Sequence, residues 1–348
     1  MHTIYTKKAG ARAVAAALAM ACGCGLAPDA MADEQVQIYG LIGSFAGSIK
    51  RSDAVARTAI VGSGGLTTSY LGFRGGEDLG DGTRAIFQLE TFFQPDNGGA
   101  GRSAADPQGF SRSGWVGLKG AFGQLTMGRH TSPYYVSMQL INPFGSSVAF
   151  SPLVVQSYVA SFSNTVIGDT VWNNAIQYVS PDIGNLSVTA IYAPGEVAGD
   201  SAVSNYGLHL RYKRGPLQAV FSGQRMRSVA VAPSTGQYAY MAGLSYDAGF
   251  ARLYGSAQAT DNAVTNIKSR TGQLGASVPV TTAGSVLFSW ARTTVDNPLA
   301  SVGKHDTVGL GYDYYLSKRT DIYATYLYDH IKTRTGGDSY ALGIRHLF

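Results

Sequence analysis

The sequence predicts an all-β fold, an antiparallel transmembrane β-barrel of about 16 strands with short periplasmic turns and long extracellular loops. Three features support this prediction: a last strand that alternates to the final residue, recurring period-2 segments, and connectors that are alternately short and long. No linker or change of composition divides the chain after its N-terminal segment, so we expect one barrel domain over residues 33–348.

The chain ends in a strand whose alternation continues to the last residue. Counting back by twos from Phe348, one face carries His346, Ile344, Leu342 and Tyr340, whereas the other face is mostly small or polar. An apolar edge strand at the terminus of a soluble protein would promote aggregation. A closed barrel in lipid has no free edge and requires an apolar outer face, which favours a membrane barrel.

Similar period-2 segments recur along the chain. In Gln237–Tyr246, for example, Tyr238, Tyr240, Leu244 and Tyr246 share one face. The other clear segments are Gln35–Phe45, Thr67–Arg74, Thr83–Phe93, Tyr206–Tyr212, Arg252–Gln258 and Thr307–Tyr315. Short connectors are expected at Gly75–Gly82, Gly120–Gly123, Pro181–Asn185, Arg214–Pro216, Asp247–Gly249 and Leu316–Arg319, and long ones at Gly47–Gly65, Gln94–Gly109, Thr131–Trp172 and Val295–Lys304. Aromatic residues near strand ends fit the girdles of a membrane barrel, with the core of a β-sandwich as the alternative.

The composition and the N-terminus indicate export. Only 14% of the residues are charged, and the chain has 44 glycines and 21 tyrosines, which is unusual for a soluble domain. Lys7, Lys8 and Arg12 precede an uncharged, Ala-rich stretch, and Ala30-Met31-Ala32 is a cleavage motif. We therefore expect residues 1–32 to be a signal peptide, with export to the outer membrane through the periplasm.

Removal of this segment would change the chemistry that the chain can offer. Cys22 and Cys24 lie within it, so the mature chain would have no disulfide, thiol nucleophile or cysteine metal site. Lipid attachment at Cys22 is an alternative interpretation. The net charge would fall from +5 to +3, and the basic residues are scattered, which argues against a nucleic-acid partner.

Several motifs resemble those of the Gram-negative general diffusion porins, in the same order and over essentially the whole mature chain. They are the segments 69–80 (SYLGFRGGEDLG), 83–90 (TRAIFQLE), 112–118 (RSGWVGL), 122–129 (FGQLTMGR), 173–181 (NNAIQYVSP), 316–320 (LSKRT) and the terminal GIRHLF. The resemblance implies a 16-stranded barrel, a homotrimer, passive diffusion of small hydrophilic solutes, and a third loop folded into the lumen. Residues 131–172 are the only loop long enough for that role, and Asn142-Pro143-Phe144-Gly145 resembles the inward bend. A flexible extracellular lid is the alternative for this loop.

The resemblance and the alternation together give the candidate pore residues. Arg112 matches a basic wall residue of the family and Glu90 an acidic one, whereas Arg74, Arg84, Arg211 and Arg252 point inward by alternation. Lipid-facing arginine costs roughly 2–4 kcal/mol at the midplane, which favours the lumen for these four. The alternative for each is an arginine at a strand end, in headgroup or trimer contact. Arg129 matches a family arginine near the trimer interface, and residues 94–109 match the loop that latches onto a neighbouring barrel.

The departures from the family pattern concern the constriction. Tyr70 and Leu41 stand where the family often has basic residues, and Asn142 replaces a frequent aspartate. No acidic residue occurs from Thr131 until Asp169, and Phe144–Phe162 is rich in Ser, Val, Tyr and Phe. Selectivity in channels comes from charges on the pore wall. We therefore expect a weak transverse field, a mild preference for anions, and a pore lined by the residues named above together with Tyr70, Asn142 and Phe144.

Two other classes of function remain as alternatives. Hydrolytic barrels need a Ser-His pair, and neither the histidines nor any phosphate-cradling or metal-binding motif supports an enzyme, so we expect no catalytic residue, cofactor or metal. A structural or adhesive barrel and a porin specific for small amphipathic or aromatic anions both stay open. The expected partners are outer-membrane lipid and lipopolysaccharide, small hydrophilic solutes and anions, and the barrel-assembly machinery through the C-terminal Phe348.

Overall fold

The computed structural model describes residues 36–103, 109–159, 164–196, 204–228, 235–298 and 303–348. The expected signal peptide lies outside these residues. In the described part of the chain, no helix has the length and apolarity needed to cross a membrane.

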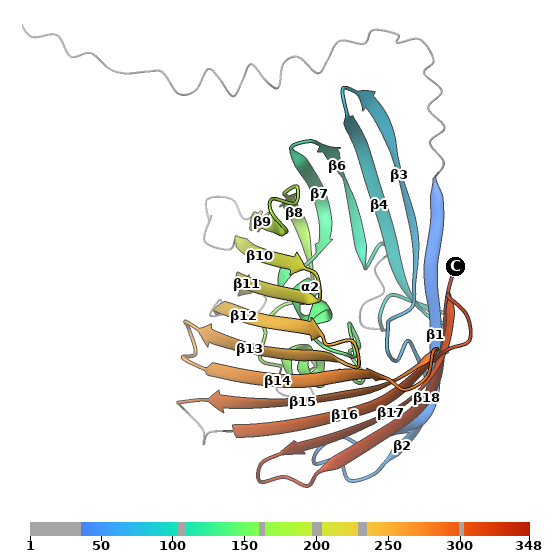
Figure 1. Cartoon of the computed structure of the whole chain (residues 1–348). Coiled ribbons are helices and arrows are strands. Elements are labelled where there is room, and N and C mark those ends of the chain that lie inside the picture. The colour runs from blue at the N-terminus through green and yellow to red at the C-terminus, as the bar shows by residue number, and fades with distance from the viewer. Residues whose placement is uncertain (1–35, 104–108, 160–163, 197–203, 229–234, 299–302) are drawn as a thin grey trace, which may run out of the picture. The chain divides into compact units, whose positions relative to one another are not determined.

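The described residues form one antiparallel sheet that closes on itself (Figure 1). Strands that follow one another along the barrel wall pair with each other, and the first strand, β1, also pairs with the last, β18. The strands are β1 (Gln37–Ile49), β2 (Thr58–Ser63), β3 (Tyr70–Gly80), β4 (Thr83–Gln94), β5 (Gly99–Ala100), β6 (Ser113–Gly120), β7 (Gly123–Thr131), β8 (Val171–Val179), β9 (Leu186–Ala193), β10 (Asn205–Arg214), β11 (Leu217–Ser228), β12 (Thr235–Asp247), β13 (Arg252–Asn262), β14 (Lys268–Pro279), β15 (Gly284–Asp296), β16 (Gly303–Tyr315), β17 (Thr320–Ile331) and β18 (Gly337–Leu347).

The 18 strands form only 16 strands of the barrel wall, which we call staves. β2 and β3 are two halves of one stave, because β2 pairs with the second half of β1 and β3 with its first half. The two-residue β5 only extends β4 into the second loop. The barrel wall therefore has 16 strands, as the sequence predicts.

The connectors alternate in length, although two boundaries differ from the expectation. The segment Gly75–Gly82 is mostly strand, and only Asp81 and Gly82 turn between β3 and β4, both with positive φ. The expected loop Gly47–Gly65 contains β2, because its residues find partners in Ser44–Ile49. Both errors come from reading glycine and polar residues as breaks, although pairing with a neighbouring strand overrides such local preferences.

The outer face of the barrel is apolar, as the alternation predicts. Tyr340, Leu342, Ile344 and Phe348 are each exposed by more than 40% in the chain alone, and Tyr238, Tyr240, Leu244 and Tyr246 are exposed in the same way. Side chains at the intervening positions, such as Ser339 and Ala341, are buried in the interior. This pattern is that of a barrel whose outer face meets lipid.

The long third loop, residues 132–170, is called L3, and its described residues (132–159 and 164–170) lie inside the barrel and include two helices. They are α2 (Pro133–Leu140) and α3 (Pro152–Tyr158). Proline stands in the first turn of both, where a missing backbone N–H has no cost, and the side chain of Ser151 caps α3 by accepting from the N–H of Val154. Helix α2 contacts β10, β11 and β12, and α3 contacts β14, β15 and β16 (Figure 1).

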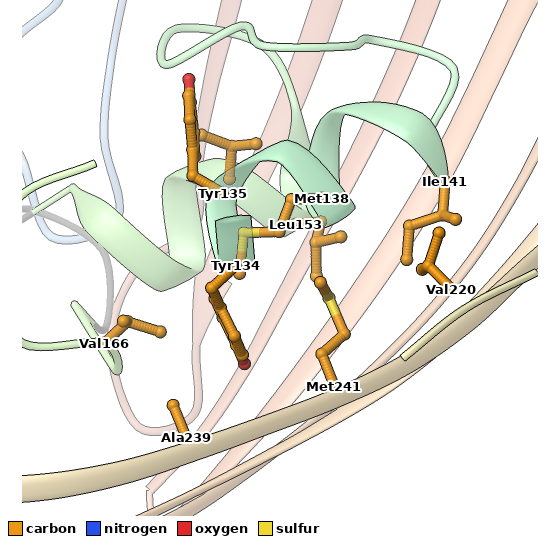
Figure 2. Packing of buried hydrophobic residues seen from close by; sticks show 10 residues of the cluster. Tyr134, Tyr135, Met138, Ile141, Leu153, Val166, Val220, Ala239 and Met241 are labelled. Carbon is orange, nitrogen blue, oxygen red and sulfur yellow. The ribbon is translucent and has the colours of Figure 1, made fainter. Parts of the chain in front are cut away.

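Apolar packing holds α2 against the wall. Tyr134 from α2 points toward β12, Leu153 from α3 lies beside Met241 on that strand, and Ile141 lies beside Val220 on β11 (Figure 2). Tyr134 and Met138 are buried almost completely. Burial of such a side chain contributes roughly 1.5–3 kcal/mol, so this cluster fixes the loop in the lumen and excludes the interpretation of L3 as a lid.

Candidate functional site: the passage beside L3

A second set of contacts fixes the α3 end of L3 through one neutral side chain. Gln156 is fully buried, and its Nε2 donates to the carbonyl oxygens of Ala291 and His305, both at 3.1 Å. The same amide donates to Thr307 at 2.8 Å and accepts from Thr293 at 2.6 Å. Because every donor and acceptor of this amide is used, replacing it would leave buried polar groups unpaired.

The bend of L3 is held by Asn142, which the structure places within the loop. Its Nδ2 donates to the carbonyl oxygens of Met138 and Gly145 at 2.5 and 2.9 Å, and its Oδ1 accepts from the N–H of Phe144. Both Asn142 and Phe144 are 3% exposed, and Phe144 packs with Phe150 and Leu287. The expectation that Asn142 and Phe144 line the pore is therefore wrong. The Asn142 amide makes hydrogen bonds within the bend, and the Phe144 ring packs against the barrel wall.

Glu90 on β4 and Arg112, just before β6, meet on the inner face of the opposite wall. Glu90 is buried and forms an ion pair with Arg112. Its carboxylate also accepts from the hydroxyl of Tyr39 at 2.8 Å and from Ser113 at 2.6 Å. The acid that the sequence places on the wall is thus neutralised and largely removed from the passage.

Aromatic rings cover the basic groups of this wall. The Arg112 guanidinium lies 4.1 Å from the ring centroid of Tyr70 and 6.0 Å from that of Phe92. Arg74 lies 4.7 Å from the ring centroid of Tyr39, and its Nε donates to Gln37 at 2.8 Å. Stacking on rings restricts each guanidinium but leaves its charge in place. We call Tyr39, Tyr70, Arg74, Phe92 and Arg112 the basic-aromatic wall.

An arginine from the second loop extends this wall toward L3. Arg102 lies 5.8 Å from the Phe92 ring centroid and binds both carboxylate oxygens of Asp169, at 2.7 and 2.5 Å. Burial raises the pKa of Asp169, but the hydrogen bonds and charge of Arg102, together with the N–H of Thr170, outweigh burial and hold that pKa below its usual range. The acid that ends L3 is therefore ionised and paired. Sequence reasoning missed Arg102, because no alternation rule applies within a loop.

The other three arginines of the sequence analysis face inward but lie away from Arg112. Arg84 lies across from Lys119, near the short turn that precedes β4. Arg252 binds Asp247 at 3.1 Å, at the short turn between β12 and β13. Arg211 binds Gln218, whose Nε2 donates to the carbonyl of Leu140 at the end of α2. Only Arg211 is therefore close to L3, whereas Arg84 and Arg252 lie at the periplasmic mouth.

Arg129 lies near the loop end of β7, and its side chain is only 12% exposed. It lies across from Gly114 next to a bulge in β7, and its Nε donates to the carbonyl of Ser111 at 2.8 Å. It also contacts Asn173 and lies 3.8 Å from Asp169. These contacts tie the ends of β7 and β8 together.

Two buried polar clusters on β16–β18 were not anticipated. Arg345 joins Asp313 and Asp321 at 3.1 and 2.8 Å, and His305 pairs with Asp329. By strand register all five side chains lie on the inward face. The alternation of inward and outward positions could therefore have identified them from the sequence. Their burial removes them from the open passage.

The described residues thus form a passage with two unlike sides. L3 carries no charged side chain from Ser132 to Gly168, and its exposed positions include apolar residues such as Val148. The basic-aromatic wall faces it. No group of three or more His, Cys, Asp or Glu side chains that could hold a metal ion occurs among the residues that the structure describes.

A barrel with an apolar outer face and an inward loop that narrows its lumen is a membrane channel of the porin class. The profile of the Gram-negative porin family matches residues 13–334. The chain is 30% identical to outer membrane porin protein 32 of Delftia acidovorans, with 84% of this chain and 83% of that protein covered. It is also 30% identical to an outer membrane porin protein of Bordetella pertussis, with 93% and 97% covered.

Among solved structures, the fold is similar to that of the anion-selective porin from Comamonas acidovorans. The TM-score is 0.77 at 26% sequence identity, and 90% of this chain and 100% of that chain are covered. The chain therefore belongs to the Gram-negative porin family, lies in the outer membrane and serves the passive diffusion of small hydrophilic solutes.

Proposed function

We propose that this porin is a weakly anion-preferring diffusion channel. The observation that carries the proposal is the absence of charge on L3 between Ser132 and Gly168, opposite a wall that carries Arg74 and Arg112. Both acids near the passage, Glu90 and Asp169, are held in ion pairs. Paired charges cancel at a distance, so Arg74, whose hydrogen-bond partner among the described residues is the neutral Gln37, sets the sign of the field.

The preference is weak because each acid cancels one base. The anion-selective porin from Comamonas acidovorans has a similar fold, which supports the sign of the proposal. Arg84 at the periplasmic mouth and Arg211, which binds the neutral Gln218, add basic groups on the inward face.

The reversal potential of the mature protein in a planar bilayer under a KCl gradient tests this function. A potential of the sign that chloride permeation produces supports it. A potential of the cation sign, or none at all, contradicts the proposed preference. No conductance would instead favour a structural or adhesive barrel.

A second candidate, preference for small aromatic anions, is favoured by the rings of Tyr70 and Phe92 around Arg112. A carboxylate on Arg112 would bring its own ring against these two. Competition of benzoate and of a sugar of matched size with the chloride current separates the candidates. Block by benzoate alone supports the aromatic preference, and equal block by both solutes contradicts it.

The proposal also includes the expected signal peptide, oligomeric state and partners of the channel. Residues 1–32 act as a signal peptide, the channel assembles as a homotrimer with Arg129 near the interface, and it has no enzymatic activity. Phe348, the exposed aromatic end of the last strand, is offered to the barrel-assembly machinery. Lipopolysaccharide contacts the outer face. Crosslinking in detergent, with trimers as the expected product, tests the assembly.

A further inference from the structure

The outward face of β11–β16 has two levels. Toward the short turns, its side chains are uncharged, for example Leu244, Leu253, Phe288 and Leu310. Toward the long loops, the outward positions carry six basic and three acidic residues, namely Arg225, Arg227, Lys268, Arg270, Arg292 and Lys304 with Asp261, Asp296 and Asp306. A lipid-facing charge costs roughly 2–4 kcal/mol at the midplane but only about 0–1 kcal/mol near the interface. These charges therefore mark the headgroup level of the outer leaflet.

A groove of about 750 Å³ begins below this level on the outer face. Ala257, Ala259 and Gly272 form its floor, because they are neighbours across β13 and β14, and the rings of Tyr240 and Trp290 stand beside it. A Cβ atom added at Gly272 would meet no atom within 4 Å, so the groove is open at that point. Small residues between large ones make an apolar furrow, which suits a hydrocarbon chain.

The upper end of the groove is basic. Arg292 is fixed by two hydrogen bonds to Asp306, at 2.7 and 3.0 Å, and lies 5.3 Å from the ring centroid of Trp290. Lys268 pairs with Asp261 at 3.2 Å. Arg270 stands between them, lines both this groove and a second hollow of about 540 Å³ above it, and has no hydrogen bond or ion pair with the residues that the structure describes.

The surroundings of Arg270 favour the binding of an anion from outside the chain. Its cross-strand neighbours are Ala259 and Thr294, and Arg292 is its diagonal neighbour on β15. Asp306 offsets the charge of Arg292, whereas Arg270 has no acidic partner among the described residues, so an anion beside Arg270 would relieve the repulsion that remains between the two like charges. The nearby carboxylates of Asp261 and Asp306 are already paired, and Asp296 lies farther toward the loop end of β15.

We propose that this groove binds a phosphorylated glycolipid of the outer leaflet, the lipid A part of lipopolysaccharide. One acyl chain lies over Ala257 and Gly272, and a phosphate group contacts Arg270 beside Arg292. The occupant follows from the charge of this level and from its place near the long extracellular loops, where the leaflet is built of this lipid. The inference rests on the outer-membrane location of the chain and is independent of the proposed anion preference.

Titration of purified lipid A into the mature protein in detergent tests the site, with the dissociation constant as the readout. Arg270→Gln removes the free cation, and we expect about fivefold weaker binding, since one basic residue near an anionic lipid surface contributes about 1 kcal/mol. Gly272→Leu fills the furrow and should weaken binding by a similar factor. Arg214→Gln, at the periplasmic end of β10, is the matched control and should bind like the wild type. Unchanged single-channel conductance shows that each variant folds.

Four results would overturn the proposal. The first is wild-type affinity in both Arg270→Gln and Gly272→Leu. The second is equal affinity for lipid A without its phosphates, which would remove the arginine contact. Equal affinity for phosphatidylglycerol would show a general anionic surface rather than a lipid A site. Loss of the oligomer in lipid-free Gly272→Leu would show that a second copy of the chain covers the groove.

Discussion

The two sides of the passage are built by different means. On the L3 side, Tyr134, Met138 and Phe150 are buried, and the neutral amide of Gln156 completes the attachment. On the basic-aromatic wall, Arg112 is held by a buried acid and by a ring. Apolar packing sets where the loop lies, and the charges on the other side set the sign of the field.

This separation explains how the chain can depart from the family pattern without loss of the fold. L3 needs no acid to stay in place, because apolar and neutral contacts hold it. The wall arginines keep their positions because Glu90 and the rings hold them on their own side. Each side can therefore be changed alone, and the following predictions use that property.

The largest effect is expected for Phe150→Ala on the L3 side. Phe150 is fully buried and packs edge-on against Phe45, with ring centroids 5.5 Å apart. Loss of a buried phenylalanine costs roughly 3–5 kcal/mol, and the free energy of unfolding in guanidinium measures it. The exposed Val148 provides the control, since Val148→Ala should change stability by less than about 0.5 kcal/mol. An equal loss in both variants would mean that L3 does not depend on this packing.

A new charge on L3 should reverse the selectivity and leave the fold intact. Val148 is 41% exposed on the loop, so Val148→Asp adds an acid without burying it. An interaction of about 1 kcal/mol would shift the cation-to-anion permeability ratio about fivefold toward cations. The reversal potential under a KCl gradient reports the shift, with Val148→Asn as the neutral control. An unchanged ratio would place Val148 outside the passage.

Removal of one wall charge should have a smaller effect of the same sign. Arg112→Gln deletes a cation, while Glu90 keeps its hydrogen bonds to Tyr39 and Ser113. We expect the preference for anions to fall about threefold, within the range for a partly exposed ion pair. Arg112→Lys keeps the charge but loses the flat stacking group, so it should retain selectivity and lose any preference for benzoate over acetate. If both variants behave alike, the charge of Arg112 does not contribute to the selectivity.

The smallest effect concerns pH. The pKa of Asp169 is lower in the folded chain than in the unfolded chain, so its ionised form stabilises the fold. This contribution is complete above the unfolded value near 3.8 and is lost as the pH falls through the lower folded value. Unfolding measured between pH 5 and about pH 2 should show a loss that is reduced in Asp169→Asn. A variant with the same acid dependence as the wild type would exclude Asp169 as its source.

The barrel itself was predictable from the sequence because its pattern is local. Lipid requires an apolar outer face, and a period of two transmits that requirement to single residues such as Leu342 and Tyr240. The same parity separates the inward positions of each strand, and the buried Glu90 lies at one of them. It fails where residues have no fixed period, which is why Arg102 was missed and why β2 was assigned to a loop.

The constriction was decided by the tertiary structure. Asn142 and Phe144 were expected to line the pore because they lie at the bend. In the structure Asn142 instead binds Met138 and Gly145, and Phe144 packs with Leu287. One sign was present in the sequence, since the inward positions Val220 and Met241 are apolar where a lumen should be polar, and this is where α2 docks. The sequence alone determined the outer surface, since an apolar outer face is required of the strands all around the barrel. Only the folded chain determined the passage, because L3 is held there by partners that include residues 78 and 151 positions away in the sequence.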